Sequence, residues 1–158
     1  MQLSRLALDD YFIKALSFAL SSGFDQDREE GSEVEPPDLK VRSRLQHLKN
    51  KQWRCELRVE LPSDPAGKFP YAFGLTLVGL FSIEKELSPD SDETLARSNA
   101  PAVLFSAARE VLASVSSRSG FPPFLLPTVT FAYDKQKNLP TSKIAPKASR
   151  KKSGVKNS

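Results

Sequence analysis

The sequence predicts an α+β domain in which one long helix packs on one face of a four-stranded antiparallel sheet. A hairpin over 38–61 alternates apolar and charged residues, and a strand over 71–83 is apolar on both sides. A helix over 99–119 follows, with apolar residues at helical spacing. The chain has 158 residues, 39% of them apolar, which is enough for one domain with a real core.

The N-terminal stretch, residues 2–20, predicts a long strand. Its last part alternates apolar and small or polar residues, but Tyr11, Phe12 and Ile13 are consecutive and leave a helix as the alternative there. A bulge near Ala7 would explain why the earliest apolar residues do not fit one strict alternation.

The acidic loop, residues 21–37, separates this strand from the hairpin. It holds six acidic residues together with Gly31 and two prolines, so none of its faces can be buried. We expect a solvated loop; an acidic docking loop is the alternative.

The hairpin over 38–61 has its turn at 49–51, and one of its faces is apolar. Cys55 lies on that face and is expected to be an inert core residue. The strand over 71–83 has small or apolar residues on its second face too, which in so short a domain predicts burial by a partner subunit. The expected subunit-interface residues are Phe73, Leu75 and Leu77.

The helix is expected to begin at Asn99 as its N-cap, with Pro101 in the first turn and Gly120 ending it in a left-handed conformation. Residues 84–98 before it are polar and read as a linker. After it, three prolines within 121–127 exclude a helix and predict an extended apolar strap.

The end of the chain changes character. Thr128 to Tyr133 could form a last strand or begin a helix. Residues 135–158 carry eight lysines and arginines and no acid, so against a total of +4 the rest of the chain is net acidic by four charges. We expect a domain over 1–134 and a disordered basic tail over 135–158.

The sequence offers little for catalysis. It has one histidine and one cysteine, no glycine-rich phosphate loop and no metal-ligand cluster. It also has no secretory signal and no apolar run long enough to span a bilayer. We therefore expect a cytoplasmic protein that is not an enzyme and uses no cofactor or metal.

The order of residues from the helix to the strap resembles that of the SecB-type protein-export chaperones. The opening stretch, with Gln2, Leu3, Arg5, Leu6 and Asp10, is similar to their first strand. The matching residues of the helix and strap are Asn99, Pro101, Leu104, Phe105, Ala108, Arg109, Glu110, Ser114, Val115, Arg118, Gly120, Phe121, Pro122, Leu126, Pro127, Val129 and Phe131.

The resemblance implies an ATP-independent holdase that binds unfolded or precursor polypeptides in an extended apolar groove, and a homo-oligomer built as a dimer of dimers. It also implies that the strand over 71–83 takes part in assembly. The expected client-binding residues are Phe81, Phe105, Phe121, Phe124, Leu125 and Leu126.

Some positions depart from the family pattern. Family members dock the SecA translocation motor through acidic residues; Asp10 fits that role, but Lys14 and Gly74 stand where acids are expected. Two alternatives therefore remain. One is a SecB-like protein with a single dedicated client, such as an antitoxin. The other is a nonspecific binder of nucleic acid or an anionic surface through the basic tail.

Overall fold

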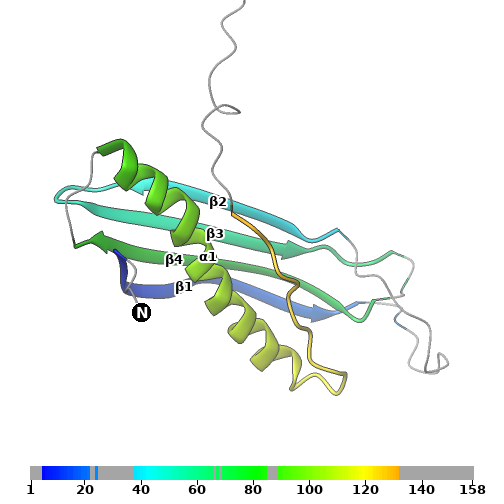
Figure 1. Ribbon diagram of the computed structural model, residues 1–158. Helices are drawn as coiled ribbons and strands as arrows, with labels where there is room; N and C mark the ends of the chain where they lie inside the picture. Colours follow the sequence, from blue (N-terminus) through cyan, green and yellow to red (C-terminus); the bar gives the residue numbers. More distant parts are fainter. Residues whose placement is uncertain are drawn as a thin grey trace, which may run out of the picture.

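The computed structural model describes residues 5–21, 24, 38–65, 67, 69–84 and 89–131. Its elements are β1 (Leu6–Leu20), β2 (Lys40–His47), β3 (Gln52–Leu61), β4 (Tyr71–Ile83) and α1 (Pro89–Ser116). The strands form one antiparallel sheet in the order β1-β4-β3-β2, and α1 crosses one face diagonally (Figure 1). The predicted fold class is confirmed. We call the covered face the helix side and the other face the open side.

β1 is a strand throughout, so the helical alternative is wrong. Its pairing with β4 shifts register between Leu8 and Asp10 and again between Ile13 and Ala15, whereas the sequence placed one bulge near Ala7. Each extra residue reverses the alternation of faces. Apolar residues before, between and after the bulges therefore all reach the helix side: Leu6, Leu8, Tyr11, Ile13, Leu16, Phe18 and Leu20.

The β2–β3 hairpin has the predicted faces and turn. Asn50 and Lys51 in the turn have positive φ angles of 61° and 60°. On β3 the helix-side residues are buried in the core, and Cys55 is among them, as predicted. On the open side the two strands carry charged and amide side chains, because that face meets water.

β4 is a central strand between β1 and β3. Its helix-side residues are buried under α1, and Gly79 lies where the helix comes closest. A Cβ atom at Gly79 would stand 2.8 Å from a methyl carbon of Leu104 and 2.8 Å from the ring of Phe81. The missing side chain therefore lets α1 pack directly on the strand.

α1 begins ten residues earlier than predicted, at Pro89, so the expected linker over 84–98 and the N-cap at Asn99 are wrong. Pro89 fits a first helical position, and acidic residues follow it in the first turn. Asn99 instead donates from Nδ2 to the Leu95 carbonyl within the helix, and Pro101 is a buried mid-helix residue. Residues 85–88 lie outside the described part.

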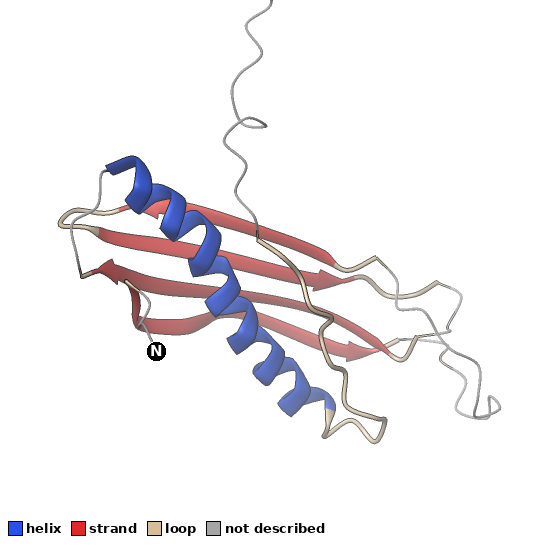
Figure 2. Ribbon diagram, in the orientation of Figure 1, coloured by secondary structure: helices blue, strands red, loops and turns tan. Residues whose placement is uncertain are grey.

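After α1, a turn at 117–120 leads to Gly120, whose φ of 86° is left-handed as predicted. The strap, residues 121–131, then runs back over the helix side beside α1 (Figure 2). Residues 128–131 are neither strand nor helix. Residues 132–133, the basic tail and all of the acidic loop except Ser21 and Phe24 lie outside the described residues.

Candidate functional site: the strap and its aromatic cluster

Seven aromatic rings gather where the strap crosses the end of the sheet. They come from β1, β4, the strap and two loops, so the fold brings together residues that are far apart in sequence. Tyr71 and Phe124 lie at the centre, each in contact with several other rings. The aromatic cluster consists of Phe18, Phe24, Phe69, Tyr71, Phe73, Phe121 and Phe124.

Hydrogen bonds fix the strap to the cluster. The Tyr71 hydroxyl donates to the Pro122 carbonyl oxygen at 2.5 Å. The Phe124 amide donates to Oγ of Ser116, the buried last residue of α1, at 2.8 Å. Together these bonds satisfy strap backbone groups that have no sheet or helix partner. The strap is therefore positioned by side chains from β4 and α1.

Further along, the strap lies against the middle of α1. Nη2 of Arg109 lies 3.4 Å from the Pro127 carbonyl oxygen, and its guanidinium is 6.0 Å from the centre of the Phe105 ring. Phe105 also contacts Phe131 edge-on, with ring centres 5.7 Å apart. Between these anchors Leu125 projects outward and is 67% exposed. The strap thus presents an apolar side chain to water directly after the half-buried ring of Phe124.

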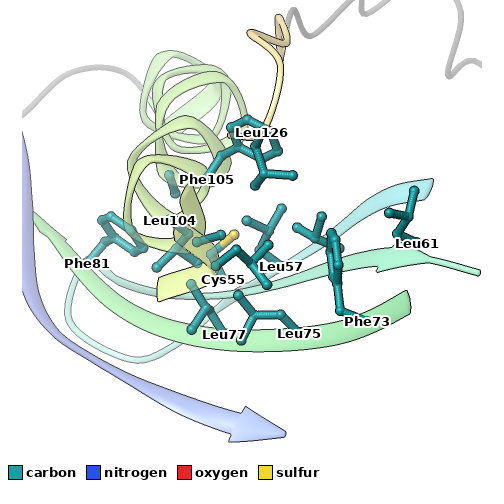
Figure 3. Close-up of a cluster of buried hydrophobic side chains, with 14 of the residues drawn as sticks. Cys55, Leu57, Leu61, Phe73, Leu75, Leu77, Phe81, Leu104, Phe105 and Leu126 are labelled. Carbon is teal, nitrogen blue, oxygen red and sulfur yellow. The ribbon is translucent and has the colours of Figure 1, made fainter. Parts of the chain in front are cut away.

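The structure divides the six predicted client-binding residues into two groups. Phe81, Phe105 and Leu126 are buried in the core (Figure 3). Phe121 and Phe124 are half-buried in the aromatic cluster, and Leu125 is exposed. Only the second group offers surface in this conformation. Phe18, which the sequence did not point to, is half-buried and belongs with it. Tyr71, also missed, is buried at the centre of the aromatic cluster. The alternation on their strands did not indicate that either ring would meet the strap.

The three predicted interface residues, Phe73, Leu75 and Leu77, are buried in the chain's own core (Figure 3), on the face that α1 and the strap cover. Their side chains leave almost no surface for a second chain. The exposed apolar surface lies instead on the helix side of β1. Five side chains there are 37% to 47% exposed: Leu8, Tyr11, Ile13, Leu16 and Leu20. The bulges that align them could not be foreseen from alternation.

On the open side, β1 is tied to β3 across β4. Nζ of Lys14 lies 3.0 Å from Oε2 of Glu56, and Nη2 of Arg54 lies 3.4 Å from the same oxygen. The hydrogen bond from Lys14, with the charges of both cations, holds the pKa of Glu56 below its ordinary value. Lys14, one of the two positions where an acid was expected, therefore makes an ion pair.

Asp10, the predicted motor-docking residue, is exposed on β1, and its carboxylate accepts a hydrogen bond from the Tyr11 amide. The second departure, Gly74, lies in a hollow of about 390 Å³ on the open side. Small side chains, including Ser17 and Ala72, line it, with Lys40 and Glu60 at one side. This hollow lies on the face of the sheet opposite the aromatic cluster, at the same end, and Phe18 and Phe73 of the cluster also border it.

Within the described residues, no three metal-ligating side chains gather, and no helix has the length and apolar character to cross a membrane. Burial and the nearby Glu56 carboxylate raise the pKa of the Cys55 thiol to about 12. The thiol therefore stays protonated and unreactive in the folded chain.

One face of the sheet is thus covered by a helix and an anchored strap, and apolar side chains are exposed along the β1 edge. The family profile of the preprotein translocase subunit SecB matches residues 1–138. The chain belongs to the SecB family of protein-export chaperones.

Individual relatives agree with this. The protein-export protein SecB of Bradyrhizobium diazoefficiens is 28% identical over 122 residues, which cover 76% of this chain and 73% of that protein. SecB of Anaplasma phagocytophilum is 44% identical over 62 residues, which cover 37% of this chain and 39% of that protein.

Among solved structures, the chain is similar to the SecB-like chaperone of Mycobacterium tuberculosis in complex with a ChAD peptide from an antitoxin. The TM-score is 0.59 at 13% identity, over 80% of this chain and 91% of that one. At this identity the similarity shows the shared fold.

Proposed function

We propose that this chain is an ATP-independent holdase of protein export, and that it holds unfolded or precursor polypeptides against the strap and the aromatic cluster. The observation that carries the proposal is the anchored strap, on which Leu125 is exposed and Phe121 and Phe124 are half-buried. SecB family membership supports the export role. A similar fold holds a peptide in the mycobacterial chaperone.

The physical basis is burial of apolar surface with little demand on sequence. A client aromatic side chain that buries about 150 to 250 Å² would gain about 4 to 6 kcal/mol before the costs of ordering the chain. Aromatic rings accept many apolar partners, because a flat ring face makes contacts that do not depend on the exact shape of the partner side chain. Such a site favours extended, apolar segments, which folded proteins hide and unfolded precursors expose.

A pair of matched variants tests this location. Leu125→Asp places a charge on the strap, whereas Leu80→Asp places one at a 36% exposed leucine on the open side of β4. Binding of a fluorescently labelled, reduced and carboxymethylated lactalbumin is measured by anisotropy. We expect Leu125→Asp to weaken binding about tenfold and Leu80→Asp to leave it near the wild-type value. Equal affinities for both variants would place the client elsewhere.

We also propose that copies of this chain associate through β1. β1 is a 15-residue edge strand with five exposed apolar side chains on its helix side, and Phe12 on the other face is 50% exposed. A long apolar edge with open backbone groups favours pairing with another strand. Antiparallel pairing of two β1 strands would join two sheets, which fits the expected dimer within a dimer of dimers.

Light scattering coupled to size exclusion tests the association. Ile13→Lys adds a charge to the apolar edge, and two such charges would meet near the axis of a β1–β1 pair. We expect Ile13→Lys to shift the protein to a smaller mass and Leu80→Asp to keep the wild-type mass. An unchanged mass for Ile13→Lys would argue against β1 as the interface.

A further inference from the structure

The opposite edge of the sheet, β2, has a different character from β1. It is hydrogen-bonded to β3 along its length, and its outer backbone groups have no partner strand among the described residues. Its eight residues, Lys40–His47, span about 26 Å of extended chain. Such an edge can accept one further strand by backbone hydrogen bonding.

Three cations line the open side of this edge. Lys40, Arg42 and Arg44 are exposed, and no ion-pair partner is found for them among the described residues. Arg42 stands directly opposite Arg58, a pairing of like charges that disfavours the sheet.

The acids of β3 that stand opposite this row do not neutralise it. Glu56, opposite Arg44, is bound by Lys14 and Arg54, and Glu60, opposite Lys40, lies 2.6 Å from Arg58. The row of cations on β2 is therefore left with its charge open to solvent.

The other face of the same strand is partly apolar. Val41 and Leu45, with Leu39 just before the strand, are half-buried and pack against the core on the helix side, whereas Ser43 and His47 on this face are exposed. A strand laid along β2 would thus meet cations on one face, and on the other the apolar side chains of Val41 and Leu45 with the hydroxyl of Ser43 between them. Because side chains alternate between faces, the complementary strand alternates acidic and apolar residues.

The charge pattern selects the kind of partner. A second copy of this chain would bring its own cations against Lys40, Arg42 and Arg44, so self-pairing at this edge is repelled. The apolar β1 edge has no such row of cations. We propose that β2 binds an extended segment of another protein in which acidic and apolar residues alternate, adding it to the sheet as a fifth strand.

The test uses a synthetic, fluorescein-labelled peptide in which three glutamates alternate with two valines between terminal glycines. Its affinity for the full chain is measured by anisotropy at low and high salt. We expect saturable binding that weakens with salt, because the Debye length falls to about 3 Å at an ionic strength of 1 M. We also expect slower hydrogen exchange of β2 amides in the complex.

Matched variants make the test specific. Arg42→Glu should lower the affinity for the glutamate peptide about tenfold. The same variant should bind a peptide that has lysines in place of the glutamates. Arg118→Glu changes the chain by the same charge at an exposed site after α1 and should leave both affinities unchanged. Client binding and aggregation suppression should be unaffected by Arg42→Glu, which separates this edge from the proposed holdase site.

Three results would overturn the proposal. One is equal binding of the glutamate and lysine peptides by the wild-type chain. Another is equal loss of binding in Arg42→Glu and Arg118→Glu. The third is binding that appears only after the acids between Asp25 and Glu35 are replaced by their amides, because the occupant of β2 would then be the chain's own acidic segment.

Discussion

The hydroxyl of Tyr71, the first residue of β4, donates a hydrogen bond to the carbonyl oxygen of Pro122 in the strap. The two residues are 51 positions apart, and the bond joins the sheet to a segment without regular structure. Tyr71 also lies at the centre of the aromatic cluster. Tyr71 therefore anchors the strap to the sheet, in addition to the bond that the Phe124 amide makes to Ser116 on α1.

Tyr71→Phe should keep the ring and lose the bond to Pro122, together with the bond that the hydroxyl accepts from Oγ of Ser119. We expect unfolding free energy to fall by about 1 kcal/mol. We also expect hydrogen exchange of the Phe124 amide to accelerate, because the strap loses an anchor near that residue. Urea unfolding and hydrogen exchange measure the two effects. Tyr11→Phe, on the exposed β1 edge, is the control; if both variants behave alike, the Pro122 bond does not hold the strap.

Gly79→Ala should destabilise the chain by about 1 to 3 kcal/mol, because the new methyl group would overlap Leu104 and Phe81 in a fully packed core. Gly74→Ala on the same strand meets only the hydroxyl of exposed Ser17, at 3.1 Å, which can rotate away. Its effect should be near zero. Comparable losses in thermal unfolding for the two variants would contradict the close approach of α1 at Gly79.

Glu56 should make stability depend on pH below its ordinary pKa of 4.5. Because Lys14 and Arg54 lower its pKa in the folded state, its contribution is complete above 4.5 and is lost as pH falls through the lowered value. The stability difference between the wild type and Glu56→Gln should therefore shrink in acid. Lys14→Gln should reduce the same difference at neutral pH. If the difference in unfolding free energy between the wild type and Glu56→Gln stays constant from acid to neutral pH, the ion pair is not its cause.

Cys55 should resist thiol reagents in the folded chain. Its pKa of about 12 and full burial leave almost no accessible thiolate at pH 8. Ellman's reagent should therefore react at the rate of unfolding, and at once in denaturant. Rapid, complete reaction in native buffer would show that α1 opens away from β3.

The hairpin illustrates what the sequence predicts well. Strict alternation from 38 to 61 correctly identified the buried face of β3, the polar open side and the turn at Asn50, because one face meets a core and the other meets water. β1 shows the limit of this reasoning. Its two bulges reset the alternation twice, and the register of β4 rather than local sequence determines where they fall.

The start of α1 and the composition of the site were harder to predict. Residues 89–98 were predicted to be a polar linker, yet Ala96 within them is fully buried in the core. The polarity of its neighbours gave no indication of this burial. Phe81, Phe105 and Leu126 were expected at the client site because they are large and apolar. Composition alone does not distinguish a core aromatic residue from a surface one, and tertiary packing assigned these three to the core.

The most direct test of the holdase proposal is suppression of aggregation of a chemically unfolded protein, followed by light scattering without ATP. We predict that the purified chain suppresses scattering at about one oligomer per client. We also predict that Leu125→Asp loses most of this effect while Leu80→Asp keeps it. No suppression by the wild-type chain at several-fold excess would contradict the proposal and leave the SecB fold without holdase activity here.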